Sequence, residues 1–244
     1  MTRKILYSTA LATCLVFLPA IPAHAEEQNS FLSNASGNVG MYSEYIFRGI
    51  TQSDESPAMQ GTFNLGAATG LYVGVWGSNV DFNDGDEAQL EVDVYGGYKW
   101  LVGPATLDTG VIYYAYPGAD RSLGYDYIEG KLGISAPVGP ATVGFNLFVS
   151  PDYFAESGLG IYKNLYVSIP VKDTGLTFNA AIDHQSIDDA AAFGVPTYAD
   201  WNAGVSYAWE KFTFGVTYYD TNLSKGDCAD GCEARVVGSI TRSF

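Results

Sequence analysis

Residues 201–219, WNAGVSYAWEKFTFGVTYY, contain two alternating segments on either side of a two-residue break, Glu210-Lys211. Side chains of an extended chain point alternately to opposite faces. On one face the two segments carry an almost unbroken apolar row: Trp201, Ala203, Val205, Tyr207, Trp209, Phe212, Phe214, Val216 and Tyr218. The opposite face is small and polar, with Asn202, Gly204, Ser206, Thr213, Gly215 and Thr217. The stretch therefore predicts a β-hairpin with one apolar face and one wet face.

The same alternation recurs along most of the chain, with no helical pattern between the segments. We predict twelve strands, at residues 38–49, 58–69, 71–82, 89–101, 105–117, 126–136, 141–150, 161–172, 175–186, 199–209, 211–222 and 234–244. Their lengths suit tilted membrane strands of about 9–11 residues. The predicted fold class is all-β.

The connections between these strands are sorted by length. Those after the even-numbered strands are tight, such as Thr69-Gly70 and Asp173-Thr174, whereas those after the odd-numbered strands are longer and acidic, such as ITQSDESP and LSKGDCADGC. Short turns at one end and long loops at the other are typical of a membrane-spanning up-and-down antiparallel β-barrel. A soluble sandwich has no reason to sort its connections in this way.

A soluble barrel with its polar face outward would show the same alternation. Aromatic residues at the ends of the apolar rows favour the membrane, because they stand where an interfacial belt would lie: Trp100, Trp201, Trp209 and Phe212. On this interpretation Met41, Tyr45 and Phe47 face lipid. Residues 71–82 are apolar on both rows, so their faces stay unassigned.

The opposite rows carry charged side chains that we predict to line the lumen. The candidates are Glu44, Arg48, Glu91, Asp93, Lys99, Asp108, Glu129, Lys131 and Asp183. The acids outnumber the bases, and charged linings select ions by sign, so a pore through this barrel should prefer cations. Pairing of Glu44 with Arg48, or of Glu129 with Lys131, would instead plug the lumen. Glycines such as Gly97 and Gly144 share these rows, where they let a neighbouring aromatic ring lie flat.

The first 25 residues have the layout of a secretory signal peptide: Arg3 and Lys4, an apolar run, and the small-x-small site Ala23-His24-Ala25. We expect residues 26–37 to be a periplasmic lead-in and residues 38–244 to form the barrel. The leader holds no acid, so 10 basic residues face 27 acidic ones in the mature chain, a formal charge of −17. Such a chain is a poor partner for nucleic acid.

Cys228 and Cys232 are the two cysteines that follow the leader. In an exported protein they predict a short-loop disulfide, since the compartment is oxidising. Zinc would need more ligands, and His184 is the only histidine after the leader.

Three motifs, SEYIFRGITQS, SPAMQGTFNLG and GLYVGVWGSNVDF, span residues 43–82 with short gaps. On these motifs the chain resembles the TorF-type porin family, proteobacterial outer-membrane proteins also catalogued as conserved hypotheticals. The resemblance covers the whole chain after the leader and implies an outer-membrane barrel with a channel role. The terminal Phe244 resembles the C-terminal aromatic by which the barrel-assembly machinery recognises such chains.

Catalytic and metal motifs are weak. His184 could serve as a general base, but no nucleophile motif accompanies it. The loop DFNDGDEAQLE misses EF-hand spacing, because Gly85 is fifth from Asp81 and not sixth. There is no phosphate-binding glycine loop, so we expect no enzyme activity, no metal and no cofactor.

Two function classes stay open from the sequence. The first is an outer-membrane porin-like channel for small polar solutes, mildly cation-selective. The second is a closed structural barrel whose acidic loops contact lipopolysaccharide or another surface. An outer-membrane hydrolase is a distant third.

Overall fold

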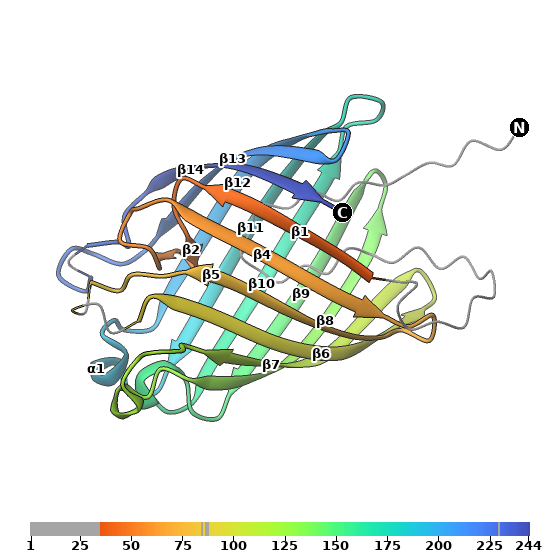
Figure 1. Ribbon diagram of the computed structural model, residues 1–244. Coiled ribbons are helices and arrows are strands. Elements are labelled where there is room, and N and C mark those ends of the chain that lie inside the picture. The colour runs from red at the N-terminus through yellow and green to blue at the C-terminus, as the bar shows by residue number, and fades with distance from the viewer. Residues whose placement is uncertain (1–34, 84, 86–87, 229) are drawn as a thin grey trace, which may run out of the picture.

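Twelve antiparallel strands form a closed barrel in the computed structural model, which describes residues 35–83, 85, 88–228 and 230–244 (Figure 1). The predicted fold class and strand number are confirmed. The barrel strands are β1 (Ala35–Tyr42), β4 (Ala58–Gly66), β5 (Leu71–Asn79), β6 (Leu90–Val102), β7 (Ala105–Ala115), β8 (Tyr127–Val138), β9 (Ala141–Ser150), β10 (Gly160–Pro170), β11 (Leu176–Ile187), β12 (Tyr198–Trp209), β13 (Phe212–Thr221) and β14 (Arg235–Ser243).

The first and last strands close the ring. β1 pairs with β14 from Asn38↔Ser243 to Tyr42↔Ser239, and with β4 from Ala35↔Leu65 to Tyr42↔Ala58. The barrel therefore begins at Ala35, three residues before the predicted start at residue 38. The signal peptide predicted at residues 1–25, and all but the last three residues of the predicted lead-in, lie outside the described residues.

The turns explain why the chain reverses where it does. At the tight end, residues in the left-handed region allow the sharp reversals, as at Gly70 (φ 104°) and Glu210 (φ 55°). The long connections lie at the other end and hold the small elements η2 (Arg121–Leu123), η3 (Phe154–Glu156) and α1 (Ala190–Phe193). Figure 1 shows α1 at this end, well away from the tight turns.

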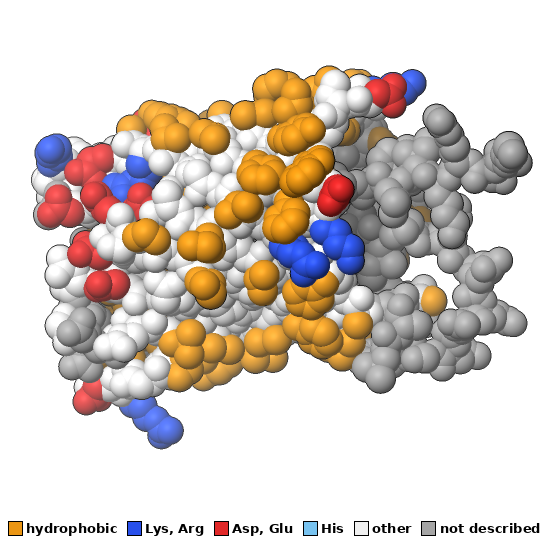
Figure 2. Space-filling view, turned by 45° about the horizontal axis from the view of Figure 1, so that its top comes forward, with side chains coloured by type: hydrophobic (Ala, Val, Ile, Leu, Met, Phe, Trp, Pro, Cys, Tyr) orange, Lys and Arg blue, Asp and Glu red, His pale blue; other side chains and the backbone are white. Residues whose placement is uncertain are grey.

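The outer surface of the barrel is apolar. Met41 is 58% exposed, and large apolar side chains on the other barrel strands are exposed in the same way. Figure 2 shows such side chains spread over the strands on one face, with most of the visible acidic side chains gathered at the end that carries the long loops. Among the described residues, no helix has the length and apolar character needed to cross a membrane.

Strand β5 resolves the faces that the sequence leaves open. Tyr72 and Trp76 are buried inside the barrel, whereas Leu71, Val73 and Val75 are exposed on its outer surface. Both rows are apolar because the inner one contributes aromatic rings to the filling of the lumen.

Intact-cell labelling should reveal which end of the barrel faces outward. With Cys228 and Cys232 replaced by serine, we expect Ser56→Cys and Lys225→Cys, both exposed in long loops, to react with an impermeant thiol reagent. Thr174→Cys, exposed in a tight turn at the other end, should react only after the outer membrane is opened. The reverse pattern would invert the topology.

Candidate functional site

Residues 43–57 connect β1 to β4, and within this segment residues 45–51 form a small hairpin inside the barrel, whereas residues 54–57 are exposed. β1 ends at Tyr42, and the short strands β2 (Ile46–Phe47) and β3 (Ile50–Thr51) pair only with each other. The prediction that Tyr45 and Phe47 face lipid is wrong: Tyr45 is 1% exposed, and Phe47 packs against the buried aromatic cluster. The predicted strand at residues 38–49 is therefore too long, although its alternation continues to Arg48.

A two-residue turn at Arg48-Gly49 reverses this inserted hairpin. Phe47 pairs with Ile50, and both turn residues have positive φ, 50° for Arg48 and 80° for Gly49, as a type I′ turn requires. A side chain on Gly49 would collide with Asp200 and Thr221 of the wall. The tip of the hairpin thus lies against the inner surface of β12 and β13.

The hairpin spans the lumen from side to side. At one side the Tyr45 hydroxyl donates to both carboxylate oxygens of Glu91 on β6, at 3.3 and 3.2 Å. At the other the Tyr198 hydroxyl of β12 donates to the Arg48 carbonyl at 2.9 Å. In the ring of strands, β6 and β12 stand six places apart in either direction, so they are opposite.

Arg48 is the most heavily bonded residue of the hairpin. Its Nη2 donates to both Glu129 oxygens at 2.8 and 2.6 Å, and its Nη1 donates to Gln185 Oε1 at 2.7 Å. Glu129 is 0% exposed and Arg48 is 8% exposed. Hydrogen bonds between charged groups, such as these from Nη2 to the Glu129 carboxylate, are stronger than those between neutral groups.

Aromatic rings surround the same guanidinium. Its Cζ lies 4.3 Å from the ring centre of Tyr162, 4.7 Å from Phe47, 5.4 Å from Tyr153 and 5.6 Å from Phe148. Burial raises the pKa of Tyr153, in the loop after β9, to about 12, so its ring stays a neutral phenol at physiological pH. Ring faces at these distances attract a cation.

The other predicted lumenal residues also turn inward, but their pairing differs from the expected one. Glu129 pairs with Arg48 and not with Lys131, because Lys131 pairs with Asp108 at 2.7 Å. Lys99 lies 3.9 Å from the same Asp108 carboxylate. Glu44 pairs with Arg235 and not with Arg48.

Three inward acids are left only partly satisfied. Asp183 accepts from Asn164 at 2.6 Å through one oxygen. Asp200 accepts from Tyr162 at 3.2 Å through one oxygen. Asp93 is the third of these acids. Among the described residues, one buried oxygen of each of these three carboxylates has no hydrogen-bond partner.

Three functional residues are absent from the sequence-based candidates: Gln185, Asp200 and Arg235. The alternation of inward and outward side chains predicts an inward position for all three. Asp200 shares the polar row of Asn202, and Arg235 alternates with the outward Val236. Gln185 follows Asp183 by two residues on β11. With Asp200 included, seven buried carboxylates face the four inward basic residues Arg48, Lys99, Lys131 and Arg235.

Glycines on the inner wall make room for flat tyrosine rings. A Cβ on Gly144 would overlap the ring of Tyr166, and one on Gly97 would overlap Tyr72. Tyr72 then reaches across to donate to Asp108 at 2.7 Å.

His184 lies on the exposed side of β11, where the Ser186 hydroxyl is 3.4 Å from its Nδ1.

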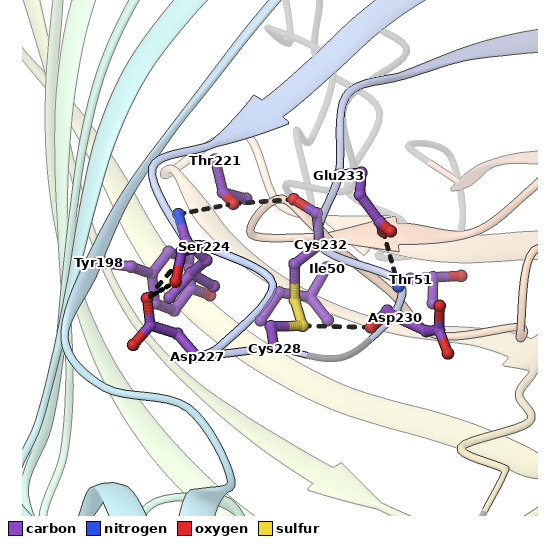
Figure 3. Close-up of a disulfide and its surroundings, with 12 residues drawn as sticks. Ile50, Thr51, Tyr198, Thr221, Ser224, Asp227, Cys228, Asp230, Cys232 and Glu233 are labelled. Atoms are coloured by element: carbon purple, nitrogen blue, oxygen red, sulfur yellow. Dashed lines mark hydrogen bonds between the residues drawn. A yellow bond between two sulfur atoms is a disulfide. The ribbon is translucent and has the colours of Figure 1, made fainter.

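The last long loop contains a disulfide and braces the hairpin (Figure 3). Cys228 and Cys232 are bonded, and the Thr221 hydroxyl donates to the Cys232 carbonyl at 2.8 Å. The Ser224 hydroxyl and amide donate to Asp227 and hold its pKa below the usual range. The Thr51 amide of β3 donates to the Gly231 carbonyl at 2.9 Å, so the disulfide loop contacts the hairpin directly.

We predict that both cysteines are oxidised in the exported protein, because that compartment is oxidising. Intact-mass analysis after alkylation without reductant should find no modified thiol, and two alkylated cysteines would refute the bond. Replacing both by serine should change barrel stability little, since so short a loop restricts the unfolded chain only weakly.

The model of one protein family matches residues 26–244. This chain belongs to that family. Its description is bacterial protein of unknown function (Gcw_chp). No curated protein matches the chain. The comparisons do not confirm the TorF-type name, whereas the outer-membrane barrel that the resemblance implies is confirmed.

Solved structures share the fold of this Gcw_chp chain at low sequence identity. The KdgM porin, solved in complex with disordered oligogalacturonate, has a TM-score of 0.59 and 9% identity, over 86% of this chain and 98% of that one. The COG4313 outer membrane channel from Pseudomonas putida F1 has a TM-score of 0.53 and 11% identity, over 86% and 96%. With the apolar exterior described above, this fold places the protein in the bacterial outer membrane.

Proposed function

We propose that the protein is a narrow outer-membrane channel for small polar solutes, closed in the conformation described above by the hairpin of residues 43–57. The observation that carries the proposal is the interior, a polar wall spanned by a separate segment. A barrel of twelve strands lies between eight-stranded barrels, which side chains fill, and sixteen-stranded ones, which leave a channel. Removing one inserted segment would therefore leave a narrow passage.

The excess of carboxylates over basic groups in the lumen supports cation preference. Rings of acidic side chains favour cations, and the acidic outer loops raise local cation concentration most at low salt. Galacturonate is an anion, so we do not extend the oligogalacturonate of the KdgM structure to this lumen.

Bilayer recording of the refolded protein tests both the channel and its selectivity. We expect brief cation-selective openings between long closed periods. Changing Glu91→Gln and Asp93→Asn together should move the reversal potential in a salt gradient toward zero, because two acidic side chains are lost from the lumen. Asp173→Asn, an exposed acid in a tight turn, is the matched control and should leave it unchanged.

A closed structural barrel is the second candidate, favoured by the buried Arg48–Glu129 pair that holds the hairpin in place. Its acidic loops would then contact lipopolysaccharide or another surface. Silent bilayers from a demonstrably folded barrel would support this function, and anion preference would contradict the cation-selective lumen.

A further inference from the structure

Most of the groups around Arg48 belong to the barrel wall. Four neighbouring strands contribute one side chain each: Glu129 on β8, Phe148 on β9, Tyr162 on β10 and Gln185 on β11. Strand pairing aligns three of them in one row, since Phe148 is opposite Tyr162 and Tyr162 is opposite Gln185. These four side chains, together with Tyr153 from the loop after β9, form what we call the guanidinium cage.

The chemistry of the cage is specific to a planar cation. The carboxylate of Glu129 accepts from one terminal nitrogen of the guanidinium, the amide oxygen of Gln185 accepts from the other, and aromatic rings surround the cation. A guanidinium presents N–H donors in a fixed fork and stacks on rings, whereas an ammonium is a compact and strongly hydrated point charge. A neutral urea matches the shape but lacks the charge.

We propose that this cage is a binding site for guanidinium-bearing solutes, and that Arg48 occupies it as a tethered ligand. A solute and Arg48 then compete for Glu129, so binding of the solute favours release of the hairpin. The assignment of these solutes as channel substrates rests on the proposed channel function, whereas binding to the cage does not.

The surroundings of the cage are acidic on one side. The Tyr162 hydroxyl donates to Asp200, which is paired in register with Asp183, so two acidic side chains adjoin the cage. The Phe148 ring belongs both to the cage and to the lining of a small hollow beside it, which Tyr72 and Lys131 also line.

Vacating the cage makes the proposal testable. In the refolded full-length Arg48→Ala protein, millimolar methylguanidinium should raise the thermal unfolding midpoint, because a ligand that binds only the folded state stabilises it. Methylurea, the neutral isostere, should not, and methylammonium should act more weakly. The wild-type protein should respond little, since a tethered side chain competes at high effective concentration.

Glu129→Gln in the Arg48→Ala background is the matched control, and it should weaken methylguanidinium affinity at least tenfold. Equal affinity with and without Glu129, or equal effects of methylguanidinium and methylurea, would overturn the proposal. If Arg48→Ala does not refold, replacing residues 43–57 by a short turn vacates the same cage for the same titration. Cage binding without any conductance would refute the channel alone, and conductance without cage binding would refute the cage alone.

Discussion

Replacing residues 43–57 by a four-residue turn should raise the mean current through the protein several-fold. Tyr42 and Ala58 are already strand partners, so a short turn can join β1 to β4 without disturbing the ring. The change removes the segment that connects Glu91 on one side of the lumen to Tyr198 on the other. Planar-bilayer recording at fixed voltage gives the comparison with the wild-type protein.

The control for this change keeps the hairpin and removes only charge. Asp54→Asn alters an exposed acid that the short turn also deletes, and it should leave the long closed periods in place. Equal currents from the wild-type and short-turn proteins would show that the hairpin does not close the lumen.

Glu129→Gln alone should raise the open probability by on the order of 100-fold or more. Removing one partner of a buried ion pair costs about 3–5 kcal/mol, and each 1.4 kcal/mol is tenfold in an equilibrium constant. The protein avoids that cost when Arg48 moves away from the wall into water, and this movement displaces the hairpin from the lumen. Single-channel dwell times measure the shift.

A double change separates this electrostatic effect from general damage. In Arg48→Met with Glu129→Gln, neither partner of the pair is left as a buried charge, so the hairpin should close the lumen more often than in Glu129→Gln alone. Arg48→Met is also measured alone. If the effects of Arg48→Met and Glu129→Gln on the open probability are additive in the double change, the Arg48–Glu129 pair does not hold the hairpin.

The barrel is predictable from the sequence because lipid and water impose opposite demands on alternate residues. At residues 201–219 the alternation predicts both faces correctly: Trp209 and Val216 are exposed on the outer surface, whereas Asn202 and Thr217 are buried inside. The faces of strand β5 cannot be predicted from alternation, because Tyr72 and Trp76 face an interior that is partly aromatic and both of its rows are therefore apolar.

The hairpin is not predictable in the same way, because its alternation matches that of the strand before it. Residues 41–48 keep a period of two across the end of β1, so the pattern alone cannot show where the chain leaves the wall. Arg48-Gly49 is a weaker turn signal than Asn-Gly, since arginine rarely adopts positive φ.

Charge pairing across the lumen is likewise a tertiary property. Alternation could have placed Asp200, Gln185 and Arg235 on the inner face. It could not have paired Arg48 with Glu129, which is 81 residues away in the chain. The guanidinium cage therefore becomes visible only once four strands are aligned.

The most direct test of the account is whether the hairpin shields the lumenal wall. Ser78 is 2% exposed and pairs in register with Glu91, which binds Tyr45. In a background with Cys228 and Cys232 replaced by serine, Ser78→Cys should resist a small cationic methanethiosulfonate reagent. With residues 43–57 replaced by the short turn, the same cysteine should react readily. Equally fast modification in both proteins would contradict a lumen closed by the hairpin.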